Sequence, residues 1–113
     1  MKIISENPQL LDEVYNDLNL KSIESEKGTK KIEGAMGDVT AYIALAALGM
    51  QTIDVFINYL SYRLSQKNNY IHFKYKNGLE VKFDNLSKEE LKKKELQIRQ
   101  DIADNKLEFI YIG

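Results

Sequence analysis

The chain has one histidine, His72, and an imidazole can act as a general base or as a metal ligand. His72 falls on the polar side of an alternating segment, where it is expected to stand opposite Lys82. Because the chain has no cysteine, a zinc site would need carboxylates to complete it, and no local spacing supplies them. We therefore expect His72 to be a surface residue and expect no metal site.

Two carboxylates, Asp38 and Asp54, lie in apolar surroundings. A buried carboxylate with a shifted pKa can be catalytic. Asp38 stands at the expected N-terminus of one helix, and Asp54 stands in the first turn of the next. A carboxylate there caps free N–H groups and interacts favourably with the helix dipole, so capping explains both residues.

The segment Gly34-Ala35-Met36-Gly37 superficially resembles a glycine-rich phosphate loop at the start of a helix. It lacks the Lys-Ser/Thr pair that follows the glycines of a P-loop, and no convincing strand precedes it. Neither a G-x-S-x-G elbow nor a dinucleotide fingerprint occurs. The sequence therefore predicts no cofactor and no catalytic residue, and we expect a protein that is not an enzyme.

Tyrosine is frequent, with seven residues in 113. Three of them lie close in sequence to Arg63, and tyrosine and arginine are enriched in protein interfaces. Two interpretations stay open, an amphipathic edge of the core or a partner-binding face. The candidate partner-binding residues are Tyr59, Tyr62, Arg63 and Tyr70.

Composition describes an ordinary globular chain, with 43% hydrophobic and 29% charged residues. Sixteen basic and seventeen acidic residues give a net charge of −1, which argues against nucleic acid as the main partner. The apolar run 41–50 has about half of the roughly 20 residues that a membrane span needs. The absence of cysteine and of an apolar signal segment near Met1 makes the cytoplasm the expected compartment.

Hydrophobic spacing indicates the elements of the first half. Asn7-Pro8 begins an amphipathic helix, with apolar residues from Leu10 to Leu18 on one side and acidic residues opposite. We expect a strand over 1–5, a weak strand over 20–25 and an exposed loop over 26–31. An apolar helix over 39–48, a break at Gly49 and a second helix over 53–64 follow, and one continuous helix kinked at Gly49 is the alternative.

The segment 70–84 predicts a β-hairpin, because two alternating runs flank Asn77-Gly78. A two-residue turn would divide the apolar residues between both faces. A three-residue turn over 76–78 pairs Phe73 with Val81 and leaves Gly78 left-handed, so we predict this register.

A capping box of Ser87 with Glu90, and a hydrophobic staple of Leu86 with Leu91, predict a helix that runs to about residue 104. The apolar segment 106–113 then predicts a strand that needs a partner strand. The fold class expected is α+β. It is a single small domain over residues 1–113, with a mainly antiparallel sheet and a central pair of apolar helices.

The order of features over Gly34–Asp84 resembles the effector-associated constant component domains, which are small accessory modules of bacterial conflict systems. Its parts are the Gly-x-Met-Gly segment, the alanine-rich run 39–48, the break at Gly49, a second helix and a hairpin. Residues 7–10 also resemble the Asp-Pro-Glu-Leu often found upstream. Tyr62 stands where members often carry tryptophan, and the strand after Asn105 is atypical. The resemblance implies a non-enzymatic adaptor that couples an effector to its sensor, and the family supplies no catalytic residues.

Three functions follow as hypotheses. The first is a cytoplasmic adaptor that binds an effector or sensor protein in a bacterial antiviral defence system. The second is an inhibitor or immunity protein that binds and blocks a toxin or enzyme. The third is a small-molecule binding or self-assembling scaffold, in which the terminal strand could pair between copies to form a homo-oligomer.

Overall fold

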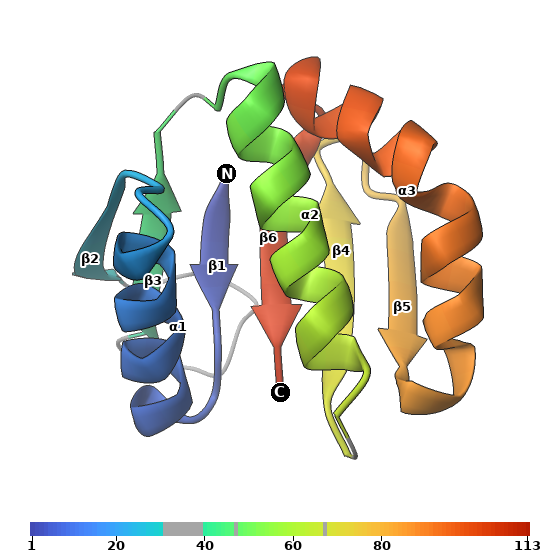
Figure 1. Cartoon of the computed structure of the whole chain (residues 1–113). Coiled ribbons are helices and arrows are strands. Elements are labelled where there is room, and N and C mark those ends of the chain that lie inside the picture. The colour runs from blue at the N-terminus through green and yellow to red at the C-terminus, as the bar shows by residue number, and fades with distance from the viewer. Residues whose placement is uncertain (31–39, 47, 67) are drawn as a thin grey trace.

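The computed structural model describes residues 1–30, 40–46, 48–66 and 68–113. Within these ranges the strands β2, β3, β1, β6, β4 and β5 form one sheet in that order (Figure 1). The elements in chain order are β1 (Lys2–Ile4), α1 (Pro8–Leu20), β2 (Ser25–Lys30), β3 (Thr40–Leu45), α2 (Met50–Leu64), β4 (Tyr70–Tyr75), β5 (Glu80–Asp84), the 3₁₀ turn η1 (Asn85–Ser87), α3 (Lys88–Ala103) and β6 (Leu107–Ile112).

The three helices lie on the same face of the sheet, with α1 over the β2–β3–β1 side, α2 across the middle and α3 beside β5 (Figure 1). The central strands β1 and β6 are parallel, and every other neighbouring pair is antiparallel. Ile3 pairs with Ile43 on one side and Ile110 on the other, and all three are fully buried. The sheet and helices therefore share one hydrophobic core, which confirms the α+β class.

The start of the chain confirms two predictions. The strand expected over 1–5 is β1, and α1 begins at Pro8. The side chain of Asn7 accepts hydrogen bonds from the backbone N–H groups of Gln9 and Leu10, so it caps the helix as its position indicates. Leu11, Val14 and Leu18 are buried, and they turn the apolar side of α1 toward the sheet.

The helix predicted over 39–48 is wrong, because residues Thr40–Leu45 form strand β3 between β2 and β1. A short apolar run does not by itself distinguish a buried helix from a buried strand. Side chains are half-buried or buried on both sides of β3, with Ile43 and Ala41 in the core and Tyr42 and Ala44 at least partly covered. Of the two helices expected at the centre of the fold, only the second forms, as α2.

The strand predicted over 20–25 and the loop predicted over 26–31 are also wrong, since β2 occupies Ser25–Lys30. Glycine in a charged segment suggested a loop. In the sheet, Gly28 pairs with Tyr42, and a Cβ atom at Gly28 would lie only 2.7 Å from the Tyr42 ring. This glycine therefore allows a close approach of an aromatic ring to a strand.

The hairpin of β4 and β5 has the predicted register. Phe73 pairs with Val81, and Lys74 pairs with Glu80. The N–H of Tyr75 donates to the carbonyl of Leu79 over 2.8 Å, and Gly78 has a φ of +92°. The three-residue turn and its left-handed glycine are confirmed.

Helix α3 ends at Ala103, close to the predicted end, but it begins with different contacts. Ser87 makes no capping hydrogen bond to α3; it exchanges hydrogen bonds with Asp84, which caps the η1 turn. Leu86 is 93% exposed, so the predicted staple with Leu91 does not form. The η1 turn therefore uses the Ser87 side chain, which the sequence pattern assigned to the cap of α3.

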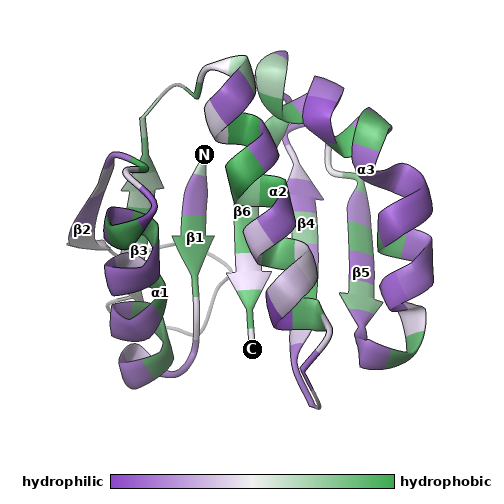
Figure 2. Ribbon diagram, in the orientation of Figure 1, coloured by the Kyte–Doolittle hydropathy of each residue, from purple (hydrophilic) through white to green (hydrophobic). Residues whose placement is uncertain are grey.

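Figure 2 shows that the helices differ in hydropathy, since α2 carries many hydrophobic residues and α3 is largely hydrophilic. Strand β6, predicted over 106–113, lies between β1 and β4 and so has a partner on each side. No helix in the described ranges is long and apolar enough to cross a membrane.

Candidate functional site

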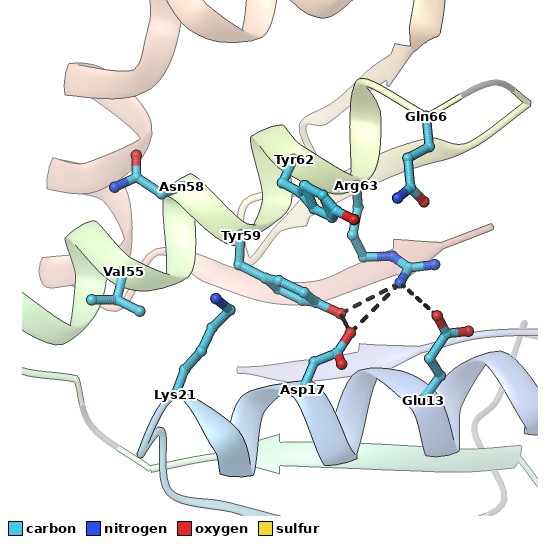
Figure 3. A pocket seen from close by; sticks show the side chains of 9 residues that line it. All are labelled: Glu13, Asp17, Lys21, Val55, Asn58, Tyr59, Tyr62, Arg63 and Gln66. Carbon is cyan, nitrogen blue, oxygen red and sulfur yellow. Dashed lines mark hydrogen bonds and ion pairs between the residues drawn. The ribbon is translucent and has the colours of Figure 1, made fainter.

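A cleft of about 600 Å³ lies between α1 and α2 (Figure 3). Aromatic, cationic, acidic and amide side chains line it together, a mixture suited to binding. The lining residues are Glu13, Asp17, Lys21, Val55, Asn58, Tyr59, Tyr62, Arg63 and Gln66.

Helical spacing places these residues. Glu13, Asp17 and Lys21 follow one another at intervals of four along α1 and its C-cap, so they lie on one side of that helix. On α2 the cleft residues recur at intervals of three and four from Val55 to Arg63, and Gln66 follows just after the C-cap of the helix. Two helix faces therefore form the walls, and long side chains bridge the space between them (Figure 3).

A buried arginine occupies the centre of the cleft. Arg63 is 5% exposed, and its Nη1 atom lies 3.4 Å from the Tyr59 hydroxyl, 3.8 Å from a Glu13 oxygen and 4.0 Å from an Asp17 oxygen. Its Nε atom is buried and has no hydrogen-bond partner among the described residues. A guanidinium has five N–H donors, so Arg63 is held by several long contacts that leave donor capacity unused.

The shortest contact across the cleft joins Tyr59 to Asp17. The Tyr59 hydroxyl donates to Asp17 Oδ2 over 2.7 Å. The Lys21 ammonium lies over the Tyr59 ring, 5.7 Å from the ring centroid. Burial raises the pKa of Tyr59, and the hydrogen bond to the Asp17 carboxylate raises it further. The phenol therefore stays protonated at neutral pH and acts there as a donor.

The cleft has an exposed aromatic rim above this buried centre. Tyr62 is 59% exposed and Val55 is 39% exposed, although both belong to the mainly buried helix α2. The two acidic and two basic side chains of the lining cancel in formal charge. The surface thus presents an apolar rim over a polar, charge-balanced base.

The structure brings together three of the four predicted partner-binding residues, Tyr59, Tyr62 and Arg63. Tyr70 lies elsewhere, at the start of β4, in a smaller hollow with His72 and Lys82. The sequence interpretation missed Glu13, Asp17 and Lys21, because they come from a helix remote in sequence. Their spacing of four along α1 was the available signal.

Of the other candidate residues, the structure describes Asp54 and His72. Asp54 lies 2.7 Å from Arg99 Nε in an ion pair and does not cap α2, so the capping prediction for Asp54 is wrong. Asp38 and the Gly34–Gly37 segment lie outside the described residues. In the described part of the chain, no three histidine or acidic residues gather as metal ligands.

His72 pairs with Lys82 as predicted, but its side chain is only 18% exposed. Its Nε2 atom is buried and lies 3.6 Å from Glu80. Burial lowers the pKa of His72, and Glu80 opposes this shift in part. The imidazole is therefore neutral near pH 7 and is less exposed than the sequence suggested.

No family model, no curated protein and no solved structure matches this chain.

Alkaline pH should destabilise the protein through Tyr59. Because its pKa is raised in the folded state, the stabilisation is fully present below about pH 10, the pKa of an unperturbed tyrosine. It is lost at higher pH, since the unfolded chain then releases a proton that the folded chain retains.

We expect the free energy of unfolding of the wild type to fall more steeply above about pH 10 than that of Tyr59→Phe. Tyr75, whose pKa is raised by burial and by Asp101, accounts for a remaining slope in the variant. Urea unfolding at a series of pH values measures both slopes, and equal slopes would contradict the assignment.

Proposed function

We propose that this protein is a non-enzymatic binding module whose cleft between α1 and α2 receives a partner protein. The observation that carries this proposal is the exposed Tyr62 beside the buried network of Arg63, Tyr59 and Asp17. Residues that contribute most to the binding energy of interfaces are most often tyrosine, tryptophan and arginine in well-packed surroundings. Here an exposed aromatic side chain stands next to a buried polar network.

The chemistry of the cleft favours binding over catalysis. A protonated phenol with a raised pKa is a poor nucleophile or base, and a guanidinium keeps its proton in proteins. The two carboxylates already contact Tyr59 or Arg63. These contacts give Tyr59 and the two carboxylates a structural role, and the exposed side chain of Tyr62 is one that a partner would cover.

The resemblance to effector-associated constant component domains suggests the setting. We propose that the partner is an effector or a sensor of a bacterial conflict system and that the protein couples the two. An inhibitor of a single enzyme would use the same kind of surface. The two functions differ in the number of proteins bound and in the effect on enzymatic activity.

Purification of the tagged protein with the products of its neighbouring genes tests the proposal. We expect an effector and a sensor to be retained together. Tyr62→Ala should weaken binding of one of them by about 30-fold, the size expected for an interface hot spot. Isothermal titration calorimetry with that purified partner measures the loss.

Tyr70→Ala is the matched control, because Tyr70 is also an exposed tyrosine, at 41%, but lies outside the cleft. It should change the affinity by less than about twofold, as expected for a residue away from the hot spot. Equal losses in both variants would rule out the cleft as the binding surface. Retention of a single enzyme with loss of its activity would favour the inhibitor.

A further inference from the structure

A second cavity, of about 420 Å³, lies between α3 and the hairpin of β4 and β5. Its volume is within the range of small-molecule sites. Its walls are mainly apolar, with Phe73, Val81 and Phe83 from the hairpin and Ile98 from α3. Phe73, Phe83 and Ile98 are almost fully buried, whereas Leu79, which also lines the cavity, is 55% exposed.

A buried carboxylate lines this cavity. Asp101 is 5% exposed and accepts two hydrogen bonds, from the Tyr75 hydroxyl over 2.7 Å and from the Gln97 amide over 2.9 Å. Both donors are neutral. A carboxylate has about four lone-pair sites, so two hydrogen bonds leave acceptor capacity.

Asp101 has no cationic partner among the described residues, since none of their ion pairs includes it. Buried charges in proteins are normally paired. Two lysines, Lys94 and Lys106, line the cavity, but both are exposed to solvent, where their charges are screened. The interaction of a cation with Asp101 would be about four times stronger at an effective dielectric constant near 20 than in water.

The aromatic walls favour the same kind of ligand. The ammonium of Lys94 lies 5.9 Å from the centroid of the Phe83 ring, which shows that a cation is accommodated beside this wall. Phe73 stands edge-on to Phe83, with ring centroids 5.9 Å apart. An ammonium inside the cavity would therefore meet aromatic rings as well as the carboxylate.

We propose that this cavity binds a small primary amine with an aromatic or aliphatic body, whose ammonium pairs with Asp101 and whose apolar part lies against Phe73, Val81 and Phe83. The site is separate from the cleft between α1 and α2, and the proposal stands independently of the protein partner.

Three probes of similar shape but different charge test whether the cavity prefers a cation. The probes are 2-phenylethylamine, its neutral analogue 2-phenylethanol and the anion phenylacetate, each titrated into the ¹⁵N-labelled full chain and followed by NMR. We expect saturable shifts at the amides of Phe73, Tyr75 and Asp101 with the amine. The alcohol should bind about tenfold more weakly, because it lacks the charge-assisted hydrogen bond.

Two variants test the assignment of Asp101. In Asp101→Asn, the amine and the alcohol should bind within about twofold of each other, because the charge that separates them is gone. If this variant does not fold, the order of the three probes on the wild type still decides. Lys94→Ala should bind the amine as tightly as the wild type or slightly more tightly, since a like charge at the mouth is removed.

Three results would overturn the proposal. Tighter binding of phenylacetate than of the amine would show that the lysines at the mouth determine the ligand. Equal binding of amine and alcohol to the wild type would remove the role of Asp101. Amine binding seen only in Lys94→Ala would show that Lys94 itself occupies the carboxylate.

Discussion

Replacing Phe56 by alanine is expected to lower the free energy of unfolding by about 3–5 kcal/mol, the range for truncating a large buried aromatic side chain. Phe56 is fully buried on the side of α2 that faces the sheet, and its loss would leave a cavity that neighbouring side chains cannot fill completely. Urea unfolding followed by circular dichroism should show a lower midpoint with an unchanged dependence on denaturant.

Val55→Ala is the matched control for this prediction. Val55 is the adjacent residue of α2, but it is 39% exposed at the rim of the cleft. Its truncation should change stability by about 0.5 kcal/mol or less, as expected at a largely exposed position. Similar losses in both variants would mean that α2 does not pack against the sheet through the Phe56 side.

Asp17→Ala is expected to cost about 2 kcal/mol, because it removes the acceptor of the buried Tyr59 hydroxyl. It also removes one of the two carboxylates near the buried guanidinium of Arg63. Asp17→Asn keeps an acceptor oxygen and should lose less. Thermal or urea unfolding of the three proteins ranks them.

Asp12→Ala serves as the control on the same helix. Asp12 forms an ion pair with Lys27 at 2.8 Å, but both side chains are exposed, at 62% and 47%. An exposed pair of this kind contributes about 0–1 kcal/mol despite its short distance. If Asp12→Ala were as destabilising as Asp17→Ala, the hydrogen bond to Tyr59 would not be the source of the difference.

A double-mutant cycle of Asp17→Ala with Tyr59→Phe isolates this bond. We expect a coupling energy of about 1 kcal/mol or more, because the two residues are in direct contact. Additive losses would show that each residue acts through other neighbours.

Local patterns in the sequence predicted those elements whose signals are short in range. Asn7-Pro8 determined the start of α1, and Asn77-Gly78 with its alternating flanks determined the register of the hairpin. In both cases the residues that carry the signal also make the hydrogen bonds. The prediction therefore needed no knowledge of the rest of the fold.

Strand β3 was missed because its conformation depends on its neighbours. Ala41, Ala44 and the adjacent apolar residues favour a helix by propensity, but the backbone of β3 bonds to β2 and β1 on its two sides. The positions of β3 that point away from the helices, Tyr42 and Ala44, are also apolar, so the segment lacks the alternation that would identify a strand. Gly28 led to the wrong prediction of a loop for a related reason, because its close contact with Tyr42 exists only once the sheet has formed.

Only the part of the candidate cleft that lies on a single helix could be predicted from the sequence. Tyr59, Tyr62 and Arg63 are three and four residues apart on one helix, so their grouping follows from helical geometry. Asp17 and Glu13 come from a helix that contacts them only through the tertiary fold. No local rule connects α1 with α2, and the buried state of Arg63 depends on that contact.

The parallel pairing of β1 with β6 has a consequence for the order of folding. Strand β1 receives its second neighbour from β6, so on the ribosome β1 cannot complete its pairing until residues 107–112 have been synthesised. Contacts between such distant segments slow folding and lengthen the exposure of unpaired strand edges. We expect nascent or C-terminally shortened chains to depend on chaperones, since Ile110 and Ile112 complete the middle of the sheet last.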